Sequence, residues 1–129
     1  MNNLLIKPTN NTPYVSFEKN GILRIEGRSY PHETINFFQP LFEWANEYRG
    51  NKTEIFIKLE YFNTSTCKQL LSLLRMIIDN NEKNVVKIIW FYEENDLDVL
   101  EIGEHMKNIL KTDFIFKPYV ENKTFKEEF

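Results

Sequence analysis

Three hydroxyl side chains follow Asn63 in the run Asn63-Thr64-Ser65-Thr66, which lies between a strand-like segment and a helix-like segment. The side-chain oxygens of Asn, Ser and Thr accept hydrogen bonds from the free N–H groups at the start of a helix, so one interpretation is a helix cap. The other is a hydroxyl presented to a partner, at a place where the same N–H groups would stabilise a phosphate. The residue types alone leave both interpretations open.

Other residues that suit catalysis or metal binding are few. His32 and His105 lie in different helical regions, and neither has a carboxylate at a metal-ligand offset together with a second histidine, so both are interpreted as structural or surface residues. Cys67 stands near a helix start, where a thiolate is favoured, but no histidine pattern accompanies it and we interpret it as a small packed residue. The four glycines are scattered, which excludes a Gly-rich phosphate loop. We therefore expect no catalytic residue, no cofactor and no metal.

Acidic residues gather where a later helix is expected to begin. Carboxylates near a helix N-terminus are stabilised by the helix dipole, and the outer face of such a helix is polar in any case. No EF-hand spacing is present, so a solvated face or a partner-docking surface is favoured over a magnesium site. The residues are Glu93, Glu94, Asp96, Asp98, Glu101 and Glu104.

Composition narrows the class of protein. The chain has 129 residues, 42% of them hydrophobic, with 16 Lys and Arg against 19 Asp and Glu. This suits one soluble domain, and the net charge of −3 gives no basic excess for binding nucleic acid. A single cysteine excludes an internal disulfide and fits a reducing compartment. No apolar run approaches the roughly 20 residues of a membrane span, and the N-terminus lacks the pattern of a secretory signal. We expect a cytoplasmic protein without membrane insertion.

Hydrophobic periodicity predicts the elements that position these residues. A hairpin is expected first, with its turn at Asn20-Gly21, whereas the short apolar start Leu4–Ile6 is assigned no element. Helices are expected over an apolar stripe from Phe37 to Tyr48 that Pro40 interrupts, from Cys67 to Ile78, and from Glu93 to Leu110. Strands are expected over residues 14–18, 22–26, 53–62, 85–92 and 114–116, with Ile55, Ile57, Leu59 and Tyr61 on one face of the third.

The order of these elements indicates the fold class. Strands that alternate with helices favour parallel pairing through right-handed crossovers, and the opening hairpin adds an antiparallel pair. The run Val85–Tyr92 is almost continuously apolar, which is typical of a strand covered on both faces. We expect an α/β fold with a mixed sheet and about three main helices in one domain, residues 1–129, with a frayed tail over 121–129.

Three blocks of the sequence resemble the SiaC family of bacterial regulatory phosphoproteins. They span about residues 27 to 104 in the expected order. His32 stands where the family usually has an acid, and Thr66 where it usually has Ser. The blocks are Gly27-Arg28-Ser29-Tyr30-Pro31 with Phe37, Phe38 and Trp44; Tyr61 to Thr66 with Lys68; and Trp90 to Asp96 with Glu101, Gly103 and Glu104.

The resemblance implies a fold like the STAS domains of anti-sigma factor antagonists and a phosphorylation switch at Thr64. In the family, a kinase with a histidine-kinase-like ATP fold and a PP2C-type phosphatase set the phosphorylation state, and the unphosphorylated form activates a diguanylate cyclase. The expected function is therefore non-enzymatic, phosphorylation-controlled partner binding in cyclic-di-GMP signalling. The alternative is a small ligand-binding domain or enzyme with a pocket at the helix start, residues 63–68. Residues assigned to partner binding are Tyr30, Asn63, Ser65, Thr66, Lys68, Glu93 and Asp96.

Overall fold

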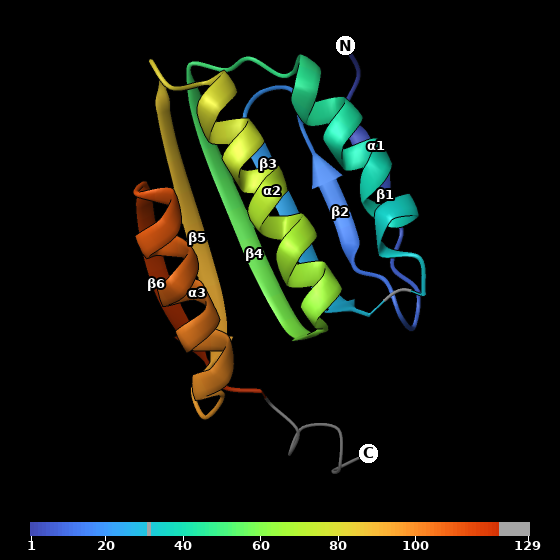
Figure 1. The fold of residues 1–129 in the computed structure, drawn as a ribbon, viewed down its shortest axis with the longest axis vertical. Helices are drawn as coiled ribbons and strands as arrows, with labels where there is room; N and C mark the ends of the chain where they lie inside the picture. Colours follow the sequence, from blue (N-terminus) through green and yellow to red (C-terminus); the bar gives the residue numbers. More distant parts are fainter. Residues whose placement is uncertain (31, 122–129) are drawn as a thin grey trace.

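A computed structural model of the protein describes residues 1–30 and 32–121. In these residues three helices cover one face of a single sheet (Figure 1), so the predicted mixed α/β fold is confirmed. The predicted tail lies outside the described residues from position 122 onward. In chain order the elements are β1 (Leu4–Ile6), β2 (Tyr14–Phe17), β3 (Ile22–Ser29), α1 (Thr34–Glu47), β4 (Lys52–Phe62), α2 (Thr64–Asn80), β5 (Val85–Glu93), α3 (Leu97–Leu110) and β6 (Asp113–Tyr119).

The strands of the sheet lie side by side in the order in which they occur in the sequence. β1, β2 and β3 pair antiparallel, and β3, β4, β5 and β6 pair parallel. Each parallel connection passes through one helix, and right-handed crossovers that always advance in the same direction put all their helices on the same face. The predicted hairpin is confirmed, with Gly21 at a φ of 102° in its turn. β1 is an additional strand that the sequence analysis missed, because three residues are too few to show a period.

Alternate residues of the central strands point toward the helices and form the core. In β4 these are Thr53, Ile55, Ile57 and Leu59, all buried. They meet the apolar stripes of the helices, as the two-residue and 3.6-residue periods predict. The helical residues buried against them include Phe38, Leu41, Trp44 and Ala45 from α1, Leu70, Leu73, Leu74 and Ile77 from α2, and Val99, Met106 and Leu110 from α3.

At its centre β5 is covered on both faces as predicted, since the consecutive residues Ile88, Ile89 and Trp90 are all buried, but the helices cover only one of these faces (Figure 1). On the side without helices, a long cationic side chain covers aromatic rings instead. The Lys58 ammonium on β4 lies 6.0 Å from the centre of the Phe91 ring on β5 and 4.6 Å from that of the Tyr119 ring on β6. Aliphatic stems of Arg and Lys shield apolar surface while their charged ends stay in water, which accounts for an apolar strand without a second layer of helices.

A bulge at the ends of β3 and β4 overturns two predictions. Gly27 was expected to end its strand, but β3 continues to Ser29. The pairing shifts after Gly27, so that Arg28 lies opposite Tyr61 and Glu60 is skipped. An extra residue reverses which face the following side chains occupy. Tyr61, expected on the buried face, is therefore 63% exposed, whereas Phe62 turns inward and its ring packs 6.3 Å from that of Trp90.

Several boundaries differ from the predicted ones. α2 begins at Thr64 rather than Cys67, because the Asn63 side chain already caps it there. Glu93 belongs to β5 rather than α3, since the Glu94 N–H continues the pairing by donating to the Tyr119 carbonyl at 2.9 Å. β6 passes through Pro118, which an edge strand tolerates because one side of its backbone is unpaired.

α1 continues through Pro40, the residue expected to interrupt it.

Among the described residues, no helix is both long and apolar enough to cross a membrane.

Candidate functional site

The start of α2 presents Thr64 to solvent. Asn63 precedes the helix in an extended conformation, and its side-chain oxygen accepts the Thr66 N–H at 2.9 Å, so the N-cap is Asn63. Thr64 is the first helical residue; it is exposed, and its hydroxyl makes no hydrogen bond with any residue that the structure describes. The N–H groups of Thr64 and Ser65 have no intrahelical acceptor at this position. The site therefore offers a free hydroxyl beside free backbone donors.

Thr66, which was assigned to partner binding, has a fully buried side chain. Its hydroxyl donates to the Ser29 carbonyl oxygen at 2.9 Å and lies 3.0 Å from the Ser29 hydroxyl, which is also fully buried. The same Ser29 carbonyl accepts the Asn63 N–H at 3.1 Å. This network fastens the first turn of α2 to the end of β3, so Thr66 has no surface for a partner and that assignment is corrected.

Ser65 and Lys68 are both exposed, and both line a hollow of about 520 Å³ between the N-termini of α1 and α2. Lys68 is four residues after Thr64, a spacing that places two side chains on the same face of a helix. It forms no ion pair with any described residue. A phosphate on Thr64 would thus have an ammonium group within reach on its own helix.

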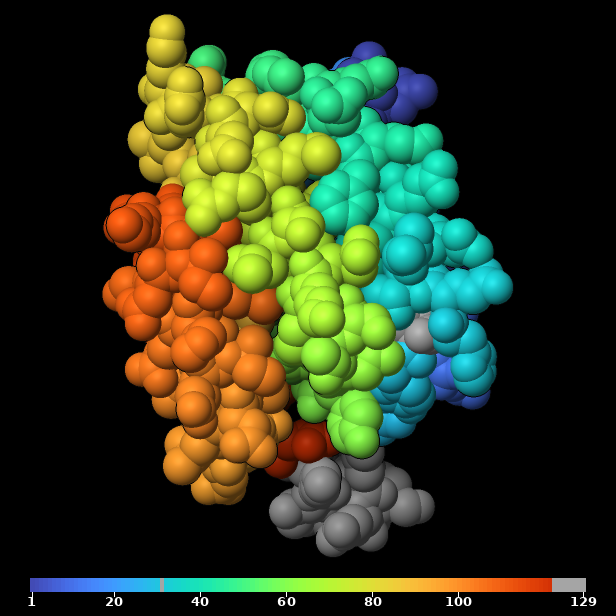
Figure 2. Space-filling view, in the orientation of Figure 1, coloured from blue at the N-terminus to red at the C-terminus, as the bar shows by residue number. Residues whose placement is uncertain are grey.

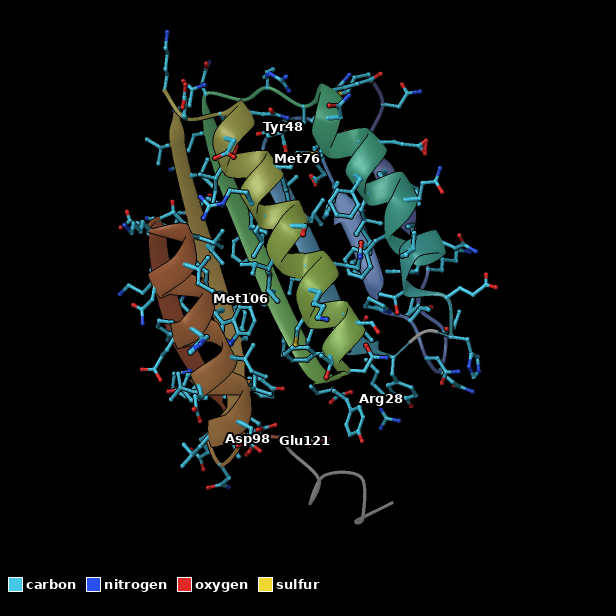
Figure 3. All side chains as sticks on the ribbon, viewed as in Figure 1. Arg28, Tyr48, Met76, Asp98, Met106 and Glu121 are labelled. Carbon is cyan, nitrogen blue, oxygen red and sulfur yellow. The ribbon has the colours of Figure 1, made fainter. Side chains whose placement is uncertain are left out.

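Tyr30 lies next to this helix start, in contact with Tyr61. The two rings meet edge to face, with centroids 5.3 Å apart and an interplanar angle of 73°. Next to them, the Arg28 Nε lies 3.6 Å from a Glu60 carboxylate oxygen. The neighbouring Tyr30 hydroxyl and Glu60 carboxylate raise the pKa of the Arg28 guanidinium above its ordinary value. Arg28 projects near the lower end of α2 in Figure 3.

Glu93 and Asp96 line a separate polar hollow of about 600 Å³, to which Tyr61 and Arg28 also contribute. Both carboxylates have local structural partners. Asp96 caps α3 by accepting the Val99 N–H at 3.2 Å, and Glu93 accepts the Asn95 N–H at 2.8 Å. The hollow reaches the Thr64 end of the molecule through Tyr61, which also packs on Tyr30.

Carboxylates around this hollow also influence Tyr119. Burial raises the pKa of the Tyr119 hydroxyl, and the negative charges of Glu60, Glu121, Glu93 and Asp96 raise it further. Despite this concentration of acids, the described residues contain no group of three or more His, Cys, Asp or Glu arranged to hold a metal ion. Of the acidic cluster, Glu94, Asp98, Glu101 and Glu104 are exposed.

Cys67 is half-buried on the side of α2 that faces α3. Burial raises the pKa of its thiol above the ordinary value, which is the reverse of what a nucleophilic cysteine needs. His32 and His105 are both exposed. His105 lines the same groove as Cys67, whereas His32 lines the hollow beside α1.

Large apolar side chains at the Thr64 end were missed by the sequence analysis. Ile35 in the first turn of α1 is 71% exposed, Tyr61 is 63% exposed, and Leu97 at the first position of α3 is 65% exposed. Ile35 stands before the apolar stripe expected from Phe37 to Tyr48, so its exposure was open to prediction, whereas Leu97 falls inside the helix expected from Glu93 to Leu110 and gave no such signal. Tyr61 had no such signal, since its exposure depends on the bulge opposite Arg28. Tyr61 lies near the end of β4, and Ile35 and Leu97 lie in the first turns of α1 and α3, which follow the parallel strands β3 and β5.

Solved structures with the same fold come from Pseudomonas aeruginosa. A chain in the crystal structure of the diguanylate cyclase SiaD in complex with its activator SiaC superposes with a TM-score of 0.81 at 22% identity, over 90% of this chain and 99% of that one. SiaC of the same organism gives a TM-score of 0.78 at 24% identity, over 94% and 100% of the two chains. Apo-SiaC gives 0.75 at 24% identity, over 91% and 99%. At these identities the likeness establishes the fold.

None of the curated proteins matches the chain. The sequence model described as the SiaC family regulatory phosphoprotein, by contrast, matches residues 6–119. This range contains every element from β2 to β6 and all of the site described above. The chain therefore belongs to the SiaC family of regulatory phosphoproteins.

Proposed function

We propose that this chain is a cytoplasmic, non-enzymatic signalling protein whose binding to an effector is switched by phosphorylation of Thr64. The observation that carries the proposal is the contrast between Thr64 and Thr66. Two residues apart in the same helical turn, one hydroxyl is exposed without a hydrogen-bond partner among the described residues and the other is buried in the Ser29 network. Only the first is open to a kinase without unfolding of the helix start.

The physical chemistry of the site suits a switch that leaves the fold intact. A phosphate adds about −1.5 to −2 charges at neutral pH. At Thr64 the helix dipole and the free N–H groups of the first turn would stabilise that charge, and Lys68 is one turn away. A phosphate would also draw Lys68 toward Thr64, removing this cation from the surface that the effector contacts. A partner packed on this end would meet an unpaired negative charge, which costs several kcal/mol in a desolvated interface.

The effector that the comparisons support is a diguanylate cyclase, because one structure of the same fold is a complex of such a cyclase with its activator. A kinase with a histidine-kinase-like ATP fold would add the phosphate and a PP2C-type phosphatase would remove it. The surface assigned to these partners consists of Tyr30, Asn63, Ser65 and Lys68, with Glu93 and Asp96 beyond Tyr61. A ligand-binding or enzymatic role would need a deep cleft with convergent polar groups, and the hollows on either side of Lys68 are surface grooves.

The test compares Thr64→Glu with Ser72→Glu, which adds the same charge at an exposed position two turns further along α2. Binding is measured by titration calorimetry against candidate diguanylate cyclases from the same genome. We expect Thr64→Ala to bind within a few-fold of wild type, Ser72→Glu to do the same, and Thr64→Glu to bind at least about 30-fold more weakly, the equivalent of about 2 kcal/mol. Equal affinity of the two acidic variants would refute the switch.

The site itself is mapped by mass spectrometry after incubation with ATP and candidate kinases from the same genome. A phosphate on Thr64 that is absent from Thr64→Ala supports the assignment. A phosphate on Ser65 would show that the switch uses a different hydroxyl.

A further inference from the structure

A second hollow, of about 520 Å³, runs between α2 and α3. In Figure 2 it follows the seam between the surface of α2 and the orange surface of α3. Its lining is mostly apolar. Cys67, Leu71 and Ile102 remain partly exposed although they pack against the core. The apolar lining consists of Cys67, Leu71, Ile102, Met106 and Ile109.

Two contacts shape this groove. On one side Gly103 lets α3 sit close to the sheet, because a Cβ there would lie 2.6 Å from the Trp90 indole nitrogen. That nitrogen also donates to the Val99 carbonyl oxygen at 3.0 Å. At the far end the Arg75 guanidinium reaches from α2 and donates to the Ile109 carbonyl oxygen at 2.8 Å, which ties the two helices together. The groove is therefore bridged at Ile109 and begins at Lys68 and Asp98, beside the start of α2.

The rim of the groove is charged asymmetrically. Asp98 and Glu101 line it along α3, and Lys68 lines it on α2 near Thr64. Asp98 and Glu101 are exposed, and neither forms an ion pair with another described residue. Figure 3 shows Asp98 at the lower end of α3, with Met106 further along the helix. A ligand that matches this surface needs an apolar face flanked on the α3 side by positive charge.

We propose that the groove between α2 and α3 binds an amphipathic helix of a partner protein, with its apolar face on Leu71, Ile102 and Ile109 and with Lys or Arg side chains opposite Asp98 and Glu101. The residues from Asp98 to Ile109 span roughly 16 Å at 1.5 Å per residue, which is about three turns of such a helix. Helix-in-groove recognition uses apolar anchors spaced by three and four residues for affinity and flanking charges for orientation. This inference deepens the proposed function, on which it rests, because the groove opens beside Thr64.

The probe is a synthetic 18-residue helical peptide with a leucine stripe flanked by lysines, and its twin carries glutamates in place of the lysines. Binding to the full chain is followed by fluorescence anisotropy, and the contacted residues are mapped by amide chemical-shift changes. We expect the lysine peptide to shift resonances on the facing sides of α2 and α3 and to bind at least about fivefold more tightly than the glutamate twin, as close charge pairs predict. Shifts confined to the sheet face without helices, or no preference for lysine, would overturn the proposal.

Matched variants locate the charge and the apolar contact. Glu101→Lys faces the groove, whereas Glu104→Lys makes the same change on the same helix at an exposed position outside the groove lining. Ile109→Gln removes an apolar residue of the groove that is 47% exposed, and Val85→Gln is its control at a position 55% exposed on β5. Glu101→Lys and Ile109→Gln should each weaken binding of the lysine peptide at least about fivefold, with both controls within twofold. Equal effects of variant and control would refute the site.

Self-association is checked by light scattering over a range of protein concentrations. A dimer that Glu101→Lys abolishes would mean that a second copy, and not a partner helix, occupies the groove, which would overturn the proposal. All these measurements use protein with an unmodified Thr64. The groove proposal can therefore be refuted while Thr64→Glu still abolishes binding of the cyclase. Likewise, the phosphorylation switch can be refuted while the lysine peptide still binds the groove.

Discussion

Thr64 and Thr66 provide a matched pair for separating a structural hydroxyl from a functional one. Replacing either with Val keeps the β-branched shape and removes only the hydroxyl. At position 66 this deletes the hydrogen bond to the Ser29 carbonyl oxygen and the contact with the Ser29 hydroxyl, both fully buried. Each lost bond costs about 1 kcal/mol, and a buried hydroxyl left unpaired costs about 1–3 kcal/mol, part of which the added methyl offsets. We expect Thr66→Val to lose about 2 kcal/mol of unfolding free energy.

At position 64 the hydroxyl is exposed and the Asn63 side chain performs the capping, so Thr64→Val should stay within about 0.5 kcal/mol of wild type. Urea unfolding followed by tryptophan fluorescence measures both values, and thermal unfolding should place Thr66→Val at least about 4 °C below wild type. A double-mutant cycle that combines Thr66→Val with Ser29→Ala should give a coupling free energy of about 0.5–3 kcal/mol. Equal stability losses for the two Val variants, or no coupling to Ser29, would refute the assignment of roles.

Two further predictions concern the groove between α2 and α3. Gly103→Ala should cost about 1–3 kcal/mol in urea unfolding, because its Cβ would lie 2.6 Å from the nearly fully buried Trp90 indole, which has no room to retreat; a stability equal to wild type would show that α3 shifts freely. The rate of alkylation of Cys67 by iodoacetamide, plotted against pH, should have its midpoint above the ordinary thiol pKa of about 8.5, because burial raises the pKa of this thiol. The folded state therefore keeps the thiol proton of Cys67 to a higher pH than the unfolded state does. The stability that this proton contributes is complete below a pH of about 8.5 and is lost as the pH rises through the raised pKa. A Cys67→Ala variant should lack this loss, and an alkylation midpoint below 8.5 would contradict the reasoning.

Much of the fold was predictable because local patterns and global packing agree in this chain. The two-residue period of Ile55, Ile57 and Leu59 and the helical stripe of Leu70, Leu73, Leu74 and Ile77 each have one physical solution, which is burial of one face. The Asn20-Gly21 turn likewise specifies a hairpin by its tolerance of positive φ. The order of strands and helices then leaves parallel pairing through right-handed crossovers as the simplest topology.

The errors occur where a residue's environment depends on a neighbour that is distant in sequence. Tyr61 continues the apolar alternation of β4, yet the shifted pairing opposite Arg28 turns it outward. β5 is covered on both faces as predicted, but its sequence carries no sign that helices cover one face and the Lys58 side chain of β4 lies over the other. Neither the bulge nor these cross-strand contacts leaves a periodic signal in the sequence.

The sequence by itself determined the α/β class, the position of the helix start at residues 63–66 and the resemblance that singles out Thr64. Only the tertiary structure decided which hydroxyls of that start are exposed, because the end of β3, more than 30 residues earlier, buries Thr66 against Ser29 and leaves Thr64 and Ser65 in solvent. The groove beside Lys68 also depends on the tertiary structure, since Gly103 and Arg75 set how α3 lies against Trp90 and α2. Capping and periodicity are properties of neighbouring residues and can be predicted along a chain, whereas exposure depends on which distant residues pack against them.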